Sequence, residues 1–171
     1  PDPASPRAQH VEQVVAVARD VADRVATIGG AGDVPLVLGG NCTITLGVIA
    51  GLCTRYPRLG LAYLDGDADM STPEHTVSGI LDAMGIAAML GLEGAAPAFA
   101  SLGPRVPLMA GRDVAVVGYD EAELEAEPRA LLVKHGVHLF DGAAVRGRAS
   151  AAAADALDAL AHRDGLIVHF D

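Results

Sequence analysis

Three aspartates alternate along one short segment, at Asp65, Asp67 and Asp69. In extended backbone, alternate side chains point to the same side, so these three carboxylates would converge. Converging carboxylates repel one another unless a cation lies among them, and hard oxygen ligands suit Mg²⁺, Mn²⁺ or Ca²⁺. The bland alternative is three solvated loop aspartates. The buried strand expected directly before them favours a metal-binding loop.

Two other binding motifs are absent. A calcium EF-hand also begins with alternating aspartates, but it needs Gly at its sixth position and Glu at its twelfth, where this chain has Met70 and Thr76. The pair Gly39-Gly40 could cradle a phosphate, but no Walker lysine and no G-x-G-x-x-G pattern accompanies it. Such a pair is commonly a tight turn into a helix, so we do not expect nucleotide binding.

Cys42 and His75 are two further candidates. Cys42 follows the strand predicted over 35–38, and His75 lies on the loop after the three aspartates. A cysteine outside a disulfide can be a nucleophile, a metal ligand or a small buried filler, and fillers are the commonest. A lone loop histidine is usually exposed and without a role, but His75 follows the aspartates and histidine titrates near neutral pH. Both stay candidates. Four other histidines lie on elements without converging partners and are interpreted as structural or surface residues: His10, His135, His138 and His162.

Strands that alternate with helices must position these residues. Apolar runs predict strands over 35–38, 59–64, 114–117, 137–140 and 166–170, and helical spacing predicts helices over 7–28, 43–56, 78–90, 121–135 and 150–162. Ser5-Pro6 would begin the first helix and Gly29-Gly30 would end it. The alternation is typical of βαβ units, so we expect an α/β fold with a parallel sheet. Residues 39–43, 65–69 and 169–171 then lie at the carboxyl ends of strands, where such sheets bind ligands.

Composition narrows the class of protein. The chain has 171 residues, a net charge of −10, 51% hydrophobic residues and only 4% aromatic residues, so we expect one domain over 1–171 with a core of Ala, Val, Leu and Ile. No cluster of basic residues indicates nucleic-acid binding, and no apolar run reaches the ~18 residues of a membrane span. Cys42 and Cys53 do not make a disulfide framework, so we expect a cytoplasmic protein with reduced thiols. Both ends of the chain are expected to be cut.

Four segments resemble the motifs of the arginase, agmatinase and formimidoylglutamase family of ureohydrolases. Residues 37–43 are similar to its G-G-D-H-S segment, 65–73 to D-A-H-x-D-x-x-T-P, 78–82 to S-G-x-x-H, and 169–171 to the first half of S-x-D-x-D. Four weak motifs in register are more specific than any one of them. The resemblance covers nearly the whole chain and implies a three-layer αβα fold with a mostly parallel sheet, whose C-terminal strands this chain lacks.

The resemblance also implies a reaction and its residues. In the family, a hydroxide bridging two Mn²⁺ ions attacks the guanidinium or amidine carbon of a small guanidino or formimino substrate. Carried over by position, the resemblance places metal ligands at Cys42, Asp65, Asp67, Asp69 and Asp171, substrate contacts at Ser71 and Ser78, and proton transfer at Asp82, with His75 as a substitute donor. We further expect a homo-oligomer.

Several positions depart from the family's pattern. Cys42 and Asp67 stand where the family has histidine ligands, and Asp82 stands where it has a proton-shuttling histidine. Asn41 replaces an aspartate, and the family's last aspartate ligand would fall beyond Asp171. A thiolate suits Zn²⁺ or Fe²⁺ better than Mn²⁺, and carboxylates shuttle protons at neutral pH only where their charged form is disfavoured. Two hypotheses therefore stand beside that of an active enzyme. One is a catalytically impaired homologue that only binds metal or assembles with other subunits, and the other is a fragment that folds poorly alone.

Overall fold

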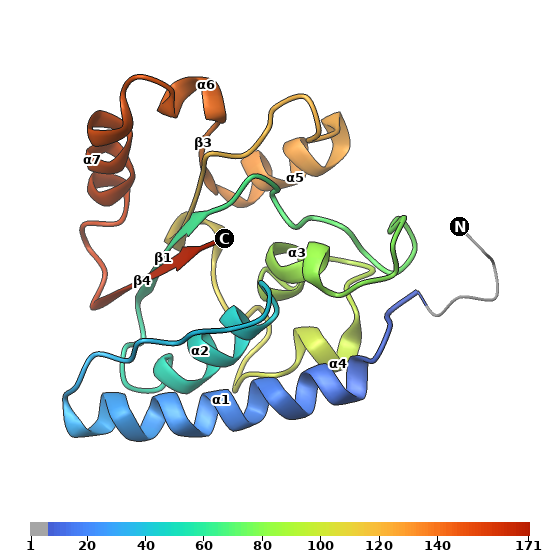
Figure 1. The fold of residues 1–171 in the computed structure, drawn as a ribbon, viewed down its shortest axis with the longest axis vertical. Helices are drawn as coiled ribbons and strands as arrows, with labels where there is room; N and C mark the ends of the chain where they lie inside the picture. The colour runs from blue at the N-terminus through green and yellow to red at the C-terminus, as the bar shows by residue number, and fades with distance from the viewer. Residues whose placement is uncertain (1–6) are drawn as a thin grey trace. The chain divides into compact units, whose positions relative to one another are not determined.

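A computed structural model describes residues 7–171, and its strands form one parallel sheet (Figure 1). The strands are β1 (Leu59–Leu64), β2 (Val114–Val117), β3 (His138–Phe140) and β4 (Gly165–Phe170), in the order β3-β2-β1-β4. All three pairings are parallel. The predicted α/β fold with a parallel sheet is confirmed.

The helices connect these strands or precede them. They are α1 (Val11–Ala31), α2 (Ile44–Leu52), α3 (Gly85–Met89), α4 (Pro97–Ala100), α5 (Ala126–His135), α6 (Gly142–Val145) and α7 (Ala149–Ala159), with short 3₁₀ turns η1 (Asp82–Met84) and η2 (Gly111–Asp113). Among residues 7–171, no helix combines the length and the apolar character that crossing a bilayer requires.

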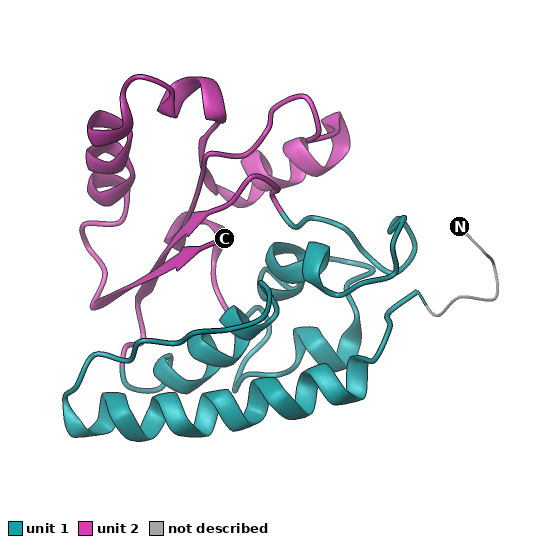
Figure 2. Ribbon diagram, viewed as in Figure 1, with its two compact units in different colours: residues 1–55, 69–108 teal, residues 56–68, 109–171 magenta. Residues whose placement is uncertain are grey.

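The chain forms two compact units, coloured separately in Figure 2. Of the described residues, unit 1 comprises 7–55 and 69–108 and contains α1 to α4, whereas unit 2 comprises 56–68 and 109–171 and contains the sheet with α5, α6 and α7. The chain passes from one unit to the other more than once. The single domain expected from the length stays a prediction.

The core of unit 2 lies between the sheet and α7. Small side chains of the central strands, Ala62, Ala115 and Val117, pack against Ala156 of α7 and against Leu160, which directly follows that helix. Alternation along the strands brings these side chains to one face, because successive residues point to opposite faces. The β1 and β4 strands pair residue for residue from Leu59↔Gly165 to Leu64↔Phe170. This register fixes which side chains meet at the carboxyl ends of the two strands.

The core of unit 1 depends on a close approach of α1 and α2. Two glycines of α2, Gly47 and Gly51, face the backbone of α1, and a Cβ atom at either would lie 2.4 Å from the carbonyl oxygen of Ala18 or Ala22. Only glycine allows two helix backbones to come so near. Since α2 directly follows residues 39–43, this packing holds that segment in place.

Several predicted elements differ from the structure, and the helices predicted over 43–56 and 150–162 end earlier, at Leu52 and Ala159. Residues 35–38 form no strand, since a strand exists only through hydrogen bonds to a neighbour, and the side chains of Leu36 and Leu38 are 85% and 88% exposed. The helix predicted from 78 begins only at 82, because Gly79 takes φ +74° and donates its N–H to Thr76 Oγ1. In α5, residues 121–125 form a turn instead of the predicted first helical turn.

The first helix begins and ends later than predicted. It begins at Val11, after His10 with φ +55°, so the predicted start at residue 7 is wrong. The proposed cap at Ser5-Pro6 lies outside the described residues. The helix continues through Gly29-Gly30 and ends where Gly32 takes φ +90°, because a left-handed residue, not a glycine in helical conformation, closes a helix.

Candidate metal site

The segment from Asp65 to Asp69 is a turn rather than an extended strand. The N–H of Asp65 donates to Val117 O (3.1 Å), its carboxylate accepts the N–H of Asp67 (2.9 Å), and Asp67 in turn accepts the N–H of Ala68 (2.6 Å). Asp69 then takes φ +45°. Aspartate favours such turns because its short carboxylate reaches the backbone nearby. The three side chains therefore differ: Asp65 is half-buried, Asp67 exposed and Asp69 buried.

The turn after β2 supports this segment. The N–H of Asp120 donates to Gly66 O at 2.9 Å, which ties the loops that follow β1 and β2 together. Beside it, Tyr119 is 2% exposed and donates its hydroxyl to Glu121 at 2.9 Å. Burial raises the pKa of the Tyr119 hydroxyl, so the phenol stays neutral and serves as a hydrogen-bond donor. The turn after β2 thus holds the loop that carries Asp65 in place.

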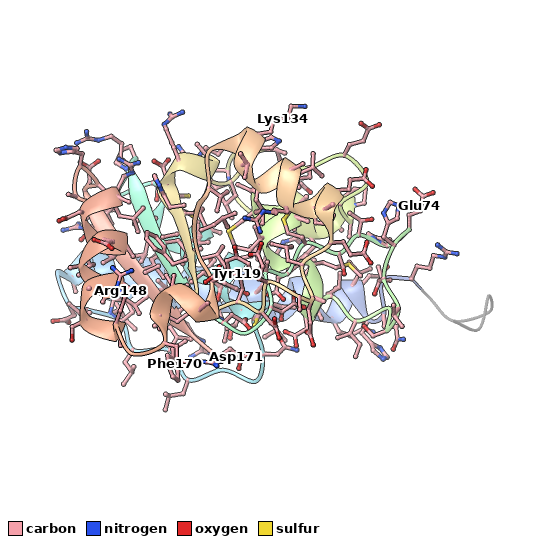
Figure 3. The ribbon with its side chains drawn as sticks, turned by 90° about the horizontal axis from the view of Figure 1, so that it is seen from above. Glu74, Tyr119, Lys134, Arg148, Phe170 and Asp171 are labelled. Carbon is pink, nitrogen blue, oxygen red and sulfur yellow. The ribbon has the colours of Figure 1, made fainter. Side chains whose placement is uncertain are left out.

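The carboxyl ends of β1 and β4 converge, as predicted for adjacent parallel strands. Tyr63 pairs with His169, and their rings stack with centroids 4.2 Å apart and planes 12° from parallel. One residue beyond the last pair, the N–H of Asp171 donates to Leu64 O at 3.0 Å. Figure 3 labels Asp171 at this strand end, next to Phe170. Asp65 and Asp171 therefore both follow the carboxyl edge of the same pair of strands.

His169 is the residue that sequence reasoning missed. Its Nε2 atom lies 3.9 Å from Asp65 Oδ2, and each of the two side chains is 10% exposed. The sequence interpretation used His169 only as part of a motif. Its alternation with Asp171 was the available signal, because residues two apart at a strand end share a face.

In unit 1, the segment around Cys42 is fixed by two polar side chains. Cys42 is 2% exposed and donates its N–H to Asp82 Oδ1 at 2.8 Å. The side-chain oxygen of Asn41 accepts both the N–H and the hydroxyl of Thr43, at 3.2 and 2.5 Å. The carboxylate of Asp82 thus holds the backbone of Cys42 in place. The other cysteine, Cys53, is buried, and burial raises the pKa of its thiol, which suits a core filler.

The remaining predicted site residues lie on the loop from Ser71 to Ser78. Ser71 is half-buried and donates its N–H to Ala83 O at 2.9 Å, whereas Ser78 is exposed. His75 is also exposed, and its Nδ1 lies 2.9 Å from Thr72 Oγ1. This contact orients the imidazole. A serine hydroxyl and an oriented imidazole on one loop are groups that can bind or protonate a small polar molecule.

The donors at the carboxyl edge of unit 2 fit a divalent cation. Asp65 and Asp171 offer carboxylate oxygens, and His169 offers an imidazole nitrogen. Oxygen and imidazole ligands together are typical of Mn²⁺, Fe²⁺ and Zn²⁺ sites in proteins. The edge lies where open parallel sheets bind their ligands.

Known proteins are similar to this chain in both sequence and fold. The arginase family model matches residues 5–171. The arginase of Brevibacillus brevis is 31% identical over 132 residues, which are 77% of this chain and 43% of that protein, and the arginase of Glaciozyma antarctica is 36% identical over 94 residues, 55% of this chain and 27% of that protein. The crystal structure of Bacillus cereus arginase superposes with a TM-score of 0.88 at 27% identity, over 97% of this chain and 56% of that one.

The chain therefore spans at most 56% of the length of these three relatives. The match nevertheless extends over residues 5–171, which include every predicted site residue. The parallel sheet, the site residues at its carboxyl edge and the family match lead to one assignment: the chain belongs to the arginase family.

Proposed function

We propose that this chain forms part of a metal-dependent hydrolase that cleaves a C–N bond of a small guanidino or formimino compound. The observation that carries the proposal is the pairing of β1 with β4, which brings Asp65 and Asp171 to one carboxyl edge of the sheet. Two carboxylates at that edge, in a member of the arginase family, favour a metal-activated hydrolysis.

The proposed cofactor is a pair of Mn²⁺ ions, in keeping with the family resemblance. The proposed ligands are Cys42, Asp65, Asp67, Asp69 and Asp171. Divalent ions of this kind lower the pKa of water and stabilise developing negative charge. Asp65 is well prepared for such a role, because its backbone and one carboxylate oxygen are already fixed by hydrogen bonds to Val117 and Asp67.

The loop residues supply the proposed substrate and proton contacts. Ser71 and Ser78 would accept or donate hydrogen bonds to the polar substrate, and His75 and Asp82 would transfer protons. The hydrogen bond from Cys42 to Asp82 favours a positioning role for Asp82. His75 is the stronger candidate for proton transfer, since an imidazole can both donate and accept a proton and Thr72 orients this ring.

Two observations favour a second function, a homologue that binds metal without turnover. Asp82 stands at the position of the family's proton shuttle, yet its carboxylate holds the backbone of Cys42. Asp67 stands at the position of a histidine ligand, yet its side chain is exposed. A protein with these changes can keep a cation while losing the groups that activate water. Such a protein would act through binding or assembly.

Metal analysis and product release on the purified intact protein separate the two functions. We expect one or two bound Mn²⁺ ions and metal-dependent release of urea or formamide from a panel of guanidino and formimino compounds. The change Asp65→Asn should abolish release, whereas Asp155→Asn, the same change at an exposed site on α7, should leave it unaltered. Metal binding without any release would establish the second function. A protein that binds no divalent ion would overturn both.

A further inference from the structure

We propose that the imidazole of His169 is a metal ligand that acts together with Asp65. The inference rests on the proposed function in one respect, that the chain holds a divalent cation. It goes beyond the family resemblance, because His169 stands at the position where the S-x-D-x-D segment has serine. The residue is therefore a feature of this chain and not of the pattern it resembles.

The separation of the two side chains suits a shared ion. His169 Nε2 lies 3.9 Å from Asp65 Oδ2, whereas a direct N–H···O hydrogen bond is ~2.7–3.2 Å long. Two ligand atoms that each lie ~2.1 Å from one ion are at most ~4.2 Å apart. A single cation can thus contact both atoms without movement of either strand. Both atoms belong to the same group of potential ligands in the structure.

The burial of the His169 and Asp65 side chains also favours cation binding. The side chains of His169 and Asp65 are each 10% exposed, so water screens their charges little. A carboxylate and an imidazole held close together and largely desolvated attract a cation more strongly than the same groups in solution. The exposed Asp171, two residues after His169 and just past the end of β4, can add a third donor when an ion binds.

The strand pairing holds the imidazole ready for ligation. Tyr63 is fully buried and stacks on the His169 ring, with the two planes only 12° from parallel. The pairing of Tyr63 with His169 across β1 and β4 fixes the backbone beneath both rings. Ligands on strands with packed side chains lose little entropy when they bind an ion.

His169 can supply an imidazole ligand that this chain otherwise lacks. At two positions, Cys42 and Asp67, this chain lacks the histidine that the family resemblance leads one to expect. His169 returns an imidazole to the donor set from a different strand. Imidazole with carboxylate binds Zn²⁺, Fe²⁺ and Co²⁺ more tightly than Mn²⁺, following the general order of divalent affinities. We therefore expect Zn²⁺ and Co²⁺ to bind more tightly than Mn²⁺.

Titration of the intact protein with Co²⁺ tests the inference, because its visible absorption reports nitrogen ligation directly. We expect His169→Ala to weaken Co²⁺ binding by more than ~100-fold, the upper range for loss of a residue that only supports a ligand, and to shift the spectrum towards coordination without nitrogen. His162→Ala, at an exposed histidine beyond α7, should change neither the affinity nor the spectrum. Calorimetry with Zn²⁺ and Mn²⁺ gives the metal preference.

Three outcomes distinguish this inference from the proposed function. Equal Co²⁺ affinity and an unchanged spectrum in His169→Ala would overturn the ligand role of His169 while leaving the metal site intact. No binding of Co²⁺, Zn²⁺ or Mn²⁺ by the unaltered protein would overturn both. If His169→Ala does not fold, the ¹⁵N resonance of His169 Nε2 in the unaltered protein decides the matter: direct ligation should shift it on saturation with diamagnetic Zn²⁺, and an unshifted resonance at saturation would refute the inference.

Discussion

Replacing Gly47 with Ala tests whether α1 and α2 approach each other so closely that only glycine fits between their backbones. The added Cβ would lie 2.4 Å from Ala18 O, about 0.6 Å nearer than the 3.0 Å at which real Cβ contacts essentially end. The contact is with backbone, so no side-chain rotation relieves it. Gly51 meets Ala22 in the same way one turn later, so tilting α2 about Gly47 offers no escape.

The size of the effect follows from two opposing contributions. Forcing an extra methyl group into a packed interface costs typically ~1–3 kcal/mol, and a clash with backbone belongs at the upper end. Alanine in place of glycine inside a helix returns about 1 kcal/mol through backbone entropy. We expect Gly47→Ala to lower the free energy of unfolding by about 2 kcal/mol, which for a chain of this size lowers Tm by roughly 4–8 °C.

Urea unfolding followed by circular dichroism, with thermal melts beside it, measures this difference. The matched control is Gly30→Ala, because Gly30 lies in α1 and a Cβ there would meet no atom within 4 Å. That change should raise stability by ~0.5–1 kcal/mol, since only the entropy contribution remains. If Gly47→Ala proves as stable as Gly30→Ala, the helices have room between them and the reasoning about their packing is wrong.

Two further predictions concern single hydrogen-bonded carboxylates. Asp82→Ala removes the acceptor of the buried Cys42 N–H and should lower the free energy of unfolding by ~1–3 kcal/mol, whereas Asp82→Asn keeps an acceptor oxygen and should cost less; urea titrations of both variants check this. The hydrogen bond from Arg58 lowers the pKa of Asp164, so its contribution to stability is present above the unfolded pKa of ~3.9 and is lost as the pH falls through the lower folded value. In Arg58→Ala, an NMR titration should show the Asp164 pKa returning towards its ordinary value, and an unchanged pKa would contradict this account.

Local pattern was sufficient for the elements that short-range forces determine. The apolar runs at 59–64 and 114–117 predicted β1 and β2 with the same first and last residues as in the structure, because a strand covered on both faces has a continuous hydrophobic sequence. Helix ends were predicted less well. Gly29-Gly30 read as a stop, yet the helix closed at Gly32, since the conformation of a glycine and not its presence ends a helix.

In the candidate site, too, the sequence predicted some features and missed others. Motif spacing alone proposed Asp65, Asp69 and Asp171 as site residues, which stays a prediction, but the alternation implied an extended run of aspartates, where the structure has a turn closed by the Asp65 carboxylate. Period-two reasoning fails where a side chain hydrogen-bonds its own backbone, since that contact competes with extended structure. Likewise, residues 35–38 have the apolar character of a strand but no neighbour to pair with in the described part of the chain.

The sequence by itself determined the family, the α/β class and the polar residues that end each strand, because these depend on residue type and spacing. Only the tertiary structure decided which strand ends meet. The pairing of β1 with β4 joins residues about a hundred positions apart, and it brings His169 onto Tyr63 and beside Asp65. No local pattern contains that register, because contacts between distant segments depend on how all the elements pack together.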